Sequence, residues 1–144
     1  MRPTLDDYVT RNMGKEIRDG QCVALVRDIW EVCHGIPHTG SVNSAIDIWK
    51  TRRSNPNILR YFDIVEGRPE KGDAIFFLPT STNSHGHVAI VFEDRGDGFN
   101  VIDQDGLAVL FRDGKPGGRQ GIIGMVKSFW SWTRYAGALR PKKI

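Results

Sequence analysis

The chain has 144 residues, a length that fits one domain better than two, and we expect a single domain over residues 1–144. Its composition, 40% hydrophobic and 26% charged, is that of a globular protein that folds without a disulfide framework or a structural metal, and its net charge of +3 is too dispersed to indicate a nucleic-acid partner. No apolar run approaches the roughly 18 residues of a membrane span, and the opening MRPTLDDYVT lacks the apolar core of a secretory signal peptide.

The first third of the sequence has the apolar spacing of helices. A short helix is expected after Thr4, whose hydroxyl can cap it, with Asp7 three positions later. A longer helix is expected over residues 20–33, with a cap at residues 19–20 and with Gly35 just beyond its end. The apolar positions of this second helix fall on one stripe, which consists of Cys22, Val26, Ile29, Trp30 and Cys33.

A third helix and then a sheet are expected to follow. Ser41 or Asn43 can cap the third helix, and from about residue 60 the apolar period becomes that of strands. Residues 95–98 and 105–106 are typical of hairpin connections, and 113–124 of a loop. The expected strands are 60–65, 73–78, 87–92, 99–103 and 107–111, with a last one over 132–139. Helices followed by an antiparallel sheet of five to six strands predict one α+β domain.

Of the two cysteines, Cys22 is the better placed for nucleophilic chemistry. Both fall on the second expected helix, about 16 Å apart along its axis, whereas a disulfide needs Cα atoms within about 7 Å, so we expect two free thiols. The thiolate is the reactive form, and the unpaired N–H groups at the amino end of a helix stabilise an anion beside Cys22. Cys33 lies at the carboxyl end, where the helix dipole has the wrong sign. The competing interpretation makes Cys22 a small buried hydrophobic residue.

A histidine on a strand can serve as the base for this thiol. His87 opens the expected strand 87–92, where a rigid backbone holds the imidazole at a fixed distance, and imidazole titrates near neutral pH. His85 would share the same strand face and is the competing base. His34 and His38 stand four positions apart, but the Gly and Pro between them and the want of further ligands argue against a metal site.

The end of the next strand supplies an acid that can orient the imidazole. Asp103 and Asp105 fall on one face by the strand period of two, and Gln104 falls on the other. If this strand pairs with the one that carries His87, Asp103 can accept a hydrogen bond from the imidazole N–H. The competing interpretation is that the Asp-Gln-Asp-Gly stretch only leads into a turn, which Asp and Gly favour.

Four segments carry a resemblance to a known family: GQCVALV at 20–26, KGDAI at 71–75, GHVAIV at 86–91 and VIDQD at 101–105. In this order they resemble the CHAP domain, the cysteine, histidine-dependent amidohydrolase/peptidase. The stretch from Asn43 to Trp49 resembles the family's small-residue segment, and 135–141 resembles its closing strand. The resemblance implies the papain-like, NlpC-like CHAP fold, with N-terminal helices packed on an antiparallel sheet.

The resemblance also implies roles for the site residues. Cys22 would be the nucleophile, and His87 the general base and later the general acid. Asp103 stands where many members carry Glu, and would orient the imidazole. The backbone N–H of Cys22 would hold the oxyanion, with Gln21 or Gln104 as a supporting donor.

The chain departs from the family pattern at two places. Asp105 stands where many members carry Asn, and because an ionised carboxylate repels an oxyanion, Asp105 would support the site only by pointing elsewhere. Some phage members bind calcium through an acidic loop before the cysteine, but residues 14–19 lack an alternating set of oxygen ligands. We therefore expect no metal and no other cofactor.

The family cleaves amide bonds of peptidoglycan, which implies a cysteine-dependent amidase or endopeptidase whose partner is peptidoglycan. We also expect the protein to be a monomer. Without a signal segment, the chain is best interpreted as a single-domain phage endolysin, made in the host cytoplasm and released to the cell wall through a holin pore. An interbacterial amidase toxin or a phage tail-associated lysin would use the same chemistry, and a catalytically inactive wall-binding or structural module would keep only the fold.

The choice of amide bond depends on loops around the groove. These loops are expected at 80–84 and 114–121. Trp130 and Trp132 lie either beside the groove or in the core, and the core is the preferred interpretation.

Overall fold

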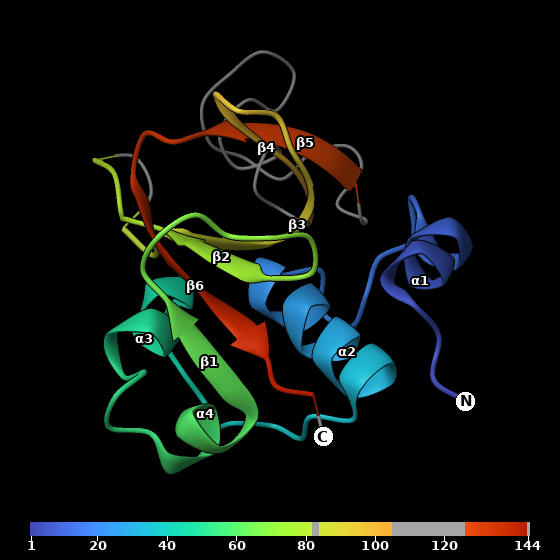
Figure 1. Ribbon diagram of the computed structural model, residues 1–144, viewed down its shortest axis with the longest axis horizontal. Coiled ribbons are helices and arrows are strands. Elements are labelled where there is room, and N and C mark those ends of the chain that lie inside the picture. Colours follow the sequence, from blue (N-terminus) through green and yellow to red (C-terminus); the bar gives the residue numbers. More distant parts are fainter. Residues whose placement is uncertain (82–83, 105–125, 144) are drawn as a thin grey trace.

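Four helices and a six-stranded sheet make up the structure, a computed structural model that describes residues 1–81, 84–104 and 126–143 (Figure 1). The helices are α1 (Leu5–Asn12), α2 (Cys22–His34), α3 (Ala45–Lys50) and α4 (Pro56–Tyr61). The strands are β1 (Phe62–Val65), β2 (Ala74–Phe77), β3 (His87–Asp94), β4 (Gly98–Asp103), β5 (Val126–Ser131) and β6 (Tyr135–Pro141). No helix within these residues is long and apolar enough to span a membrane.

The sheet is antiparallel throughout, in the order β1-β6-β2-β3-β4-β5. The expected α+β class, with helices preceding an antiparallel sheet, is confirmed. The hairpin expected at 95–98 is also confirmed, since Arg95 N donates to Gly98 O at 2.9 Å between β3 and β4. The strand expected at 107–111, the turn at 105–106 and the loop at 113–124 lie outside the described residues.

The first two helices begin close to where the sequence predicts. The Thr4 hydroxyl caps α1 by accepting from Asp7 N at 3.1 Å, as expected. The cap predicted at 19–20 for α2 is wrong, because Gln21 is the N-cap, and Asp19 instead accepts from Gln21 N at 3.0 Å. Gly35 ends α2 in the left-handed region, with φ of 67°, as expected of a C-terminal glycine.

Two local predictions fail for reasons that the cap chemistry explains. The cap of α3 is Ser44 rather than Ser41 or Asn43, because only Ser44 has an acid three positions on: Asp47 completes a capping box and accepts from Ser44 N at 3.1 Å. Residues 60–61, predicted as strand, are the last turn of α4.

The sheet boundaries differ in two further places. The helix α4 starts at Pro56, and Asn55 caps it by accepting from Asn57 N at 3.0 Å, so β1 can begin only at residue 62. The strand β5 was not predicted, and the last strand begins three residues later than the predicted 132.

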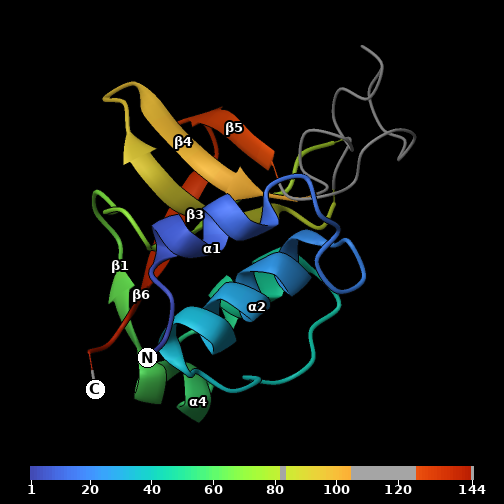
Figure 2. The same ribbon diagram turned by 90° about the vertical axis from the view of Figure 1, so that its right-hand side faces the viewer.

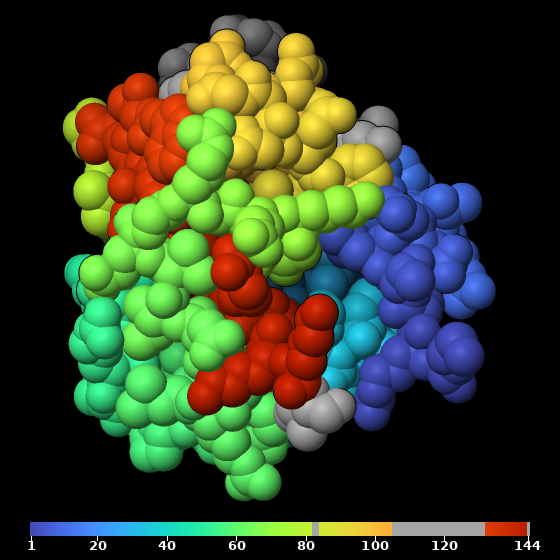
Figure 3. Space-filling view, viewed as in Figure 1, coloured from blue at the N-terminus to red at the C-terminus, as the bar shows by residue number. Residues whose placement is uncertain are grey.

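The helices cover one face of the sheet. Figures 1 and 2 show α1 and α2 on that face, while α3 packs against β2, β3 and β6, and α4 against β1. Figure 3 shows part of α2, in cyan, between the blue N-terminal residues and the red C-terminal strand. Val88 and Ile90 on β3 belong to the cluster under the helices, whereas Ala89 and Val91 belong to a second buried cluster on the opposite face. This alternation determines which residues of β3 and β4 can meet.

Candidate active site

The cysteine expected to act as the nucleophile is the first residue of α2. Gln21 precedes it as the N-cap, and the first bond of the helix runs from Leu25 N to Gln21 O at 3.3 Å. The N–H groups of residues 22–24 therefore have no acceptor within the helix and lie at its positive end. Cys22 is partly exposed in a cleft of about 670 Å³, which residues 22–24 help to line.

The expected base, His87, opens β3 directly after a tight turn. Gly86 has a φ of +68°, and a Cβ on it would lie 2.6 Å from the carbonyl oxygen of Phe77, so the turn requires glycine. The His87 ring stacks on the Phe77 ring with centroids 6.3 Å apart. Only 3% of His87 is exposed, and both Gly86 and His87 line the same cleft as Cys22.

The expected orienting residue, Asp103, reaches His87 from the neighbouring strand. Ile90 of β3 pairs with Ile102 of β4, so one further step places Asp103 opposite Ala89 and makes it a diagonal neighbour of His87 on the same face. The carboxylate is fully buried, and its Oδ2 lies 2.9 Å from His87 Nε2. The strand pairing on which the sequence argument depended is therefore present, and Asp103 belongs to a strand rather than to a turn.

The imidazole of His87 has hydrogen bonds with both side chains. Since Nε2 faces Asp103, Nδ1 is the nitrogen left for the hydrogen bond with Cys22. Burial lowers the pKa of His87, but the hydrogen bonds with Asp103 and Cys22 outweigh burial and raise the pKa to about 10. At neutral pH the imidazole is thus held as an imidazolium. A chain of two hydrogen bonds therefore runs from Cys22 in the cleft, through His87, to the buried Asp103.

The competing base, His85, has a different set of contacts. Its Nδ1 lies 2.7 Å from the hydroxyl of Ser44, and its carbonyl oxygen accepts from Ile46 N at 3.1 Å. His85 and Ser44 both line the cleft, but the contact with Asp103 belongs to His87. The geometry therefore favours His87 as the partner of Cys22 and places His85 on the cleft wall.

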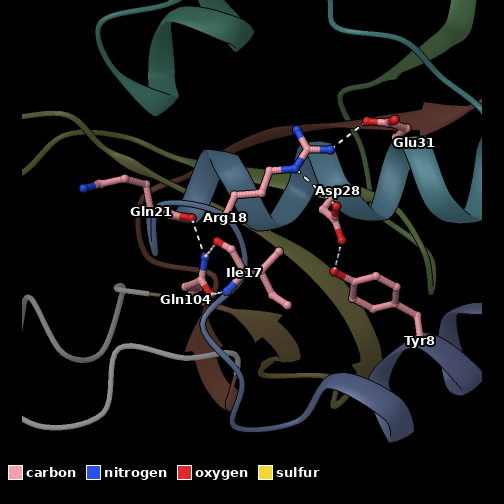
Figure 4. A network of polar contacts seen from close by, with 7 residues as sticks. All are labelled: Tyr8, Ile17, Arg18, Gln21, Asp28, Glu31 and Gln104. Atoms are coloured by element: carbon pink, nitrogen blue, oxygen red, sulfur yellow. Dashed lines mark hydrogen bonds and ion pairs between the residues drawn. The ribbon is translucent and has the colours of Figure 1, made fainter.

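Gln104 ties the segment before Cys22 to the end of β4 (Figure 4). Its Oε1 accepts from Ile17 N at 2.8 Å, and its Nε2 donates to Ile17 O at 3.0 Å and to Gln21 O at 2.9 Å. The side chain is fully buried and both amide protons are used. Gln104 is therefore not placed to donate to an oxyanion, and its contacts favour a supporting role.

Arg18 holds the same segment against the surface of α2. Its backbone has a φ of 54°, its Nε lies 3.2 Å from Asp28 Oδ1, and its Nη2 lies 2.7 Å from Glu31 Oε2. Asp28 also accepts a hydrogen bond from the Tyr8 hydroxyl of α1 (Figure 4). The loop before the nucleophile is thus fixed by Gln104 on its buried side and by Arg18 on its exposed side.

The remaining expected residues fall into three groups. The Gln21 side chain points away from Gln104 (Figure 4), and Gln21 lines the cleft together with Cys22. Asp105, Trp130 and loop 114–121 offer no described side chains. Trp132 packs edge-on against Phe99, in the cluster on the sheet face opposite the helices, in agreement with the preferred core interpretation.

The second cysteine shares the helix but not the chemistry. Both thiols are free, as expected. Burial, together with the charges of Asp28 and Asp7, raises the pKa of Cys33 to about 11, so this thiol stays protonated at neutral pH. Within the described parts of the chain, no three His, Cys, Asp or Glu side chains gather as a metal site, and His38 contacts Arg27 instead.

Replacing Gln104 by Leu is expected to loosen the loop before Cys22. The change keeps a buried side chain of similar size but leaves the buried N–H and C=O of Ile17 without their partner, at about 1–3 kcal/mol for each group. We expect the free energy of unfolding to fall by about 2–6 kcal/mol. We also expect the rate at which iodoacetamide alkylates Cys22 at pH 7, followed by peptide mass spectrometry, to fall about tenfold as the contact with His87 is lost.

Two controls belong to this experiment. Asn100→Ala changes an amide on the same strand that donates to Glu93 Oε1 at 2.8 Å, and it should leave the labelling of Cys22 unchanged. Cys33 is the internal reference and should stay unlabelled in every variant. A Gln104→Leu protein that loses stability yet alkylates Cys22 at the original rate would show that Gln104 does not position the nucleophile.

Comparison with known proteins identifies the family and the fold. The CHAP-domain profile matches residues 12–105, about two thirds of the chain. No curated protein matches the sequence significantly. Among solved structures, Ly7917 is similar with a TM-score of 0.62 at 17% identity, over 90% of this chain and 57% of that one. A wild-type endolysin, LysIME-EF1, is similar with a TM-score of 0.61 at 18% identity, over 98% of this chain and 65% of that one.

A second structure of Ly7917, described as holding the hydrolysing product of MDP, has the fold in common to the same degree, with a TM-score of 0.61 at 17% identity. It too is longer, and this chain spans 57% of it. At these identities the structures establish a common fold, whereas the profile spans the segments that carry Cys22, His87 and Asp103. The chain belongs to the CHAP-domain family.

Proposed function

We propose that this protein hydrolyses an amide bond of peptidoglycan through a cysteine thiol. Cys22 is the nucleophile, His87 the general base and acid, and Asp103 the residue that positions the imidazole. The observation that carries the proposal is the hydrogen-bonded line from buried Asp103 through His87 to Cys22, which ends in a cleft of about 670 Å³. A nucleophile, its base and an orienting acid held in this order are what thiol hydrolysis requires.

Acylation begins from the thiolate of Cys22 beside the imidazolium of His87. The sulfur attacks the substrate carbonyl carbon, and the oxygen takes up the negative charge as the C–S bond forms. The N–H of Cys22, which has no acceptor in α2, and the amide of Gln21 donate to this oxyanion. The intermediate collapses with cleavage of the C–N bond, and the leaving amine takes the proton of the imidazolium.

Deacylation uses the same groups in the reverse sense. Neutral His87 takes a proton from water, whose oxygen attacks the thioester carbon. The second tetrahedral intermediate releases a carboxylic acid, and the thiolate and the imidazolium are restored. Through its hydrogen bond, Asp103 keeps the ring orientation and favours the protonated ring each time that it forms.

An endolysin is the biological role that these features support best. The chain is similar in fold to the endolysin LysIME-EF1 over 98% of its length. In this role the protein would be made in the host cytoplasm and reach the cell wall after release through a holin pore. Its net charge of +3 would give a small bias towards an anionic envelope.

Cys22→Ala tests the proposed activity. Without the sulfur no acyl-enzyme can form, so we expect lysis of purified cell walls, followed by turbidity, to fall at least about a thousandfold. Cys33→Ala is the matched control, because it removes the other thiol of the same helix, and it should lyse walls as the unmodified protein does. Equal lysis by the unmodified protein and Cys22→Ala would exclude Cys22 as the nucleophile, and no lysis by either would favour a non-enzymatic module.

Asp103→Asn tests the source of the raised pKa of His87. Asn keeps the size of the side chain but removes the negative charge, so the pKa of His87, about 10 in the unmodified protein, should move down towards the ordinary 6.5. The alkaline limb of the pH profile of wall lysis should move with it from about pH 10 towards neutral pH. Asp97→Asn, in the exposed β3–β4 turn, should leave this limb in place.

The raised pKa of His87 also predicts how the stability of the unmodified protein and of Asp103→Asn depends on pH. Because folding raises the pKa of His87, the stability that its protonation contributes is fully present below about pH 6.5 and is lost as the pH rises through about 10. The difference in the free energy of unfolding between the unmodified protein and Asp103→Asn should therefore be largest below pH 6.5 and shrink towards pH 10. A difference that is constant across this window would contradict the coupling.

A further inference from the structure

The wall of the cleft beyond Cys22 contains a buried arginine that the sequence analysis missed. Arg27 lies on α2 five residues after the nucleophile, is 9% exposed, and lines the same cleft. Its Nη2 donates to Gly40 O at 2.5 Å, its Nη1 contacts His38 Nε2, and its Nε is buried without a hydrogen-bond partner. Its position just beside the apolar stripe of α2 is the only signal that the sequence offered.

The charge of Arg27 has no counterion among the residues that the structure describes. The neighbouring cation in the cleft, Arg18, is paired with Asp28 at 3.2 Å and Glu31 at 2.7 Å. No carboxylate lies within ion-pair distance of Arg27 in the described parts of the chain, and burial together with the charge of Arg18 lowers the pKa of its guanidinium. Since arginine stays protonated in proteins, this is a buried positive charge, which costs free energy unless an anion accompanies it.

The hydrogen-bonding groups around Arg27 also include more donors than His38 can accept from. Burial and the charges of Arg27 and Arg18 lower the pKa of His38, so this imidazole is neutral at neutral pH. Both of its nitrogens nevertheless face donors: Nε2 faces Arg27, and Nδ1 lies 3.1 Å from Gly40 N. A neutral imidazole accepts at one nitrogen only. One of these two donors therefore has no acceptor on His38, and an anion bound in the cleft would supply one.

We propose that Arg27 and His38, which both line the cleft, form a carboxylate-binding subsite in it. The inference rests on the proposed function and names the feature of the substrate that the site recognises. The five residue steps from Cys22 to Arg27 advance about 7.5 Å along the helix axis, which corresponds to about two residues of an extended peptide. The subsite thus accepts a carboxylate carried about two residues from the scissile carbonyl, and the fork of the guanidinium matches its two oxygens.

Stem peptides of peptidoglycan provide a matched pair of probes. A muramyl tripeptide can carry its second residue as D-isoglutamate, with a free α-carboxylate, or as D-isoglutamine, with a neutral amide of nearly the same shape. We would measure the dissociation constants of both by NMR titration of the full chain with Cys22→Ala, which binds without cleaving. The acid should bind about ten to a hundred times more tightly than the amide, the range for a hydrogen bond to a charged group.

Three further variants in the Cys22→Ala background assign the preference to Arg27. Arg27→Gln should weaken binding of the acid to the level of the amide. Arg27→Lys keeps the charge but loses the fork and should retain part of the preference, and it serves if Arg27→Gln does not fold. Arg60→Gln is the matched control, because Arg60 lies on α4 over Tyr61 and does not line the cleft, and it should keep the full preference.

The outcomes separate this inference from the proposed function. Equal affinity for the acid and the amide, a full preference that survives in Arg27→Gln, or no binding of either probe would overturn the subsite, even if the native protein lyses walls. A preference for the acid that depends on Arg27 in a protein that does not lyse walls would uphold the subsite and overturn the proposed hydrolysis.

Discussion

The arrangement of the candidate site depends on one buried hydrogen bond, between Asp103 Oδ2 and His87 Nε2. The carboxylate has no exposed surface, and its hydrogen bond with the ring, together with that between the ring and Cys22, outweighs the burial that lowers the pKa of His87. The other nitrogen of the same ring faces Cys22. The imidazole of His87 therefore links the buried side chain of Asp103 to the sulfur of Cys22 in the cleft.

The end of β4 controls both halves of this arrangement. Asp103 sets the state of the imidazole, and Gln104, the next residue, holds the loop that leads into α2 by its three hydrogen bonds to Ile17 and Gln21. Because successive strand residues point to opposite faces, one short stretch can contact His87 on one side and the loop before Cys22 on the other. Cys33, on the same helix, has neither of these contacts, and burial together with nearby carboxylates raises the pKa of its thiol to about 11.

Periodicity and spacing predicted the parts of this structure that depend on local chemistry. The apolar stripe of α2, the opening of β3 at His87 and the strand that ends at Asp103 follow from spacing alone, and the fold class follows from their order. The helix α4 was missed because its Pro56 and Asn55 signals stand directly before an apolar run that continues into β1. Arg27 and the clamp of Gln104 were missed because their significance depends on partners 11 to 87 residues away in the sequence, which no local pattern encodes.

The protonation state of His87 is the quantity that tests this account most directly. Nitrogen-15 NMR of the imidazole, recorded as a function of pH on the unmodified protein, reports the charge and the proton position of each ring nitrogen separately. The account predicts an imidazolium, with a proton on both Nδ1 and Nε2, that persists through neutral pH and titrates near pH 10. A ring that loses its charge near pH 6.5, as an isolated histidine does, would contradict the account.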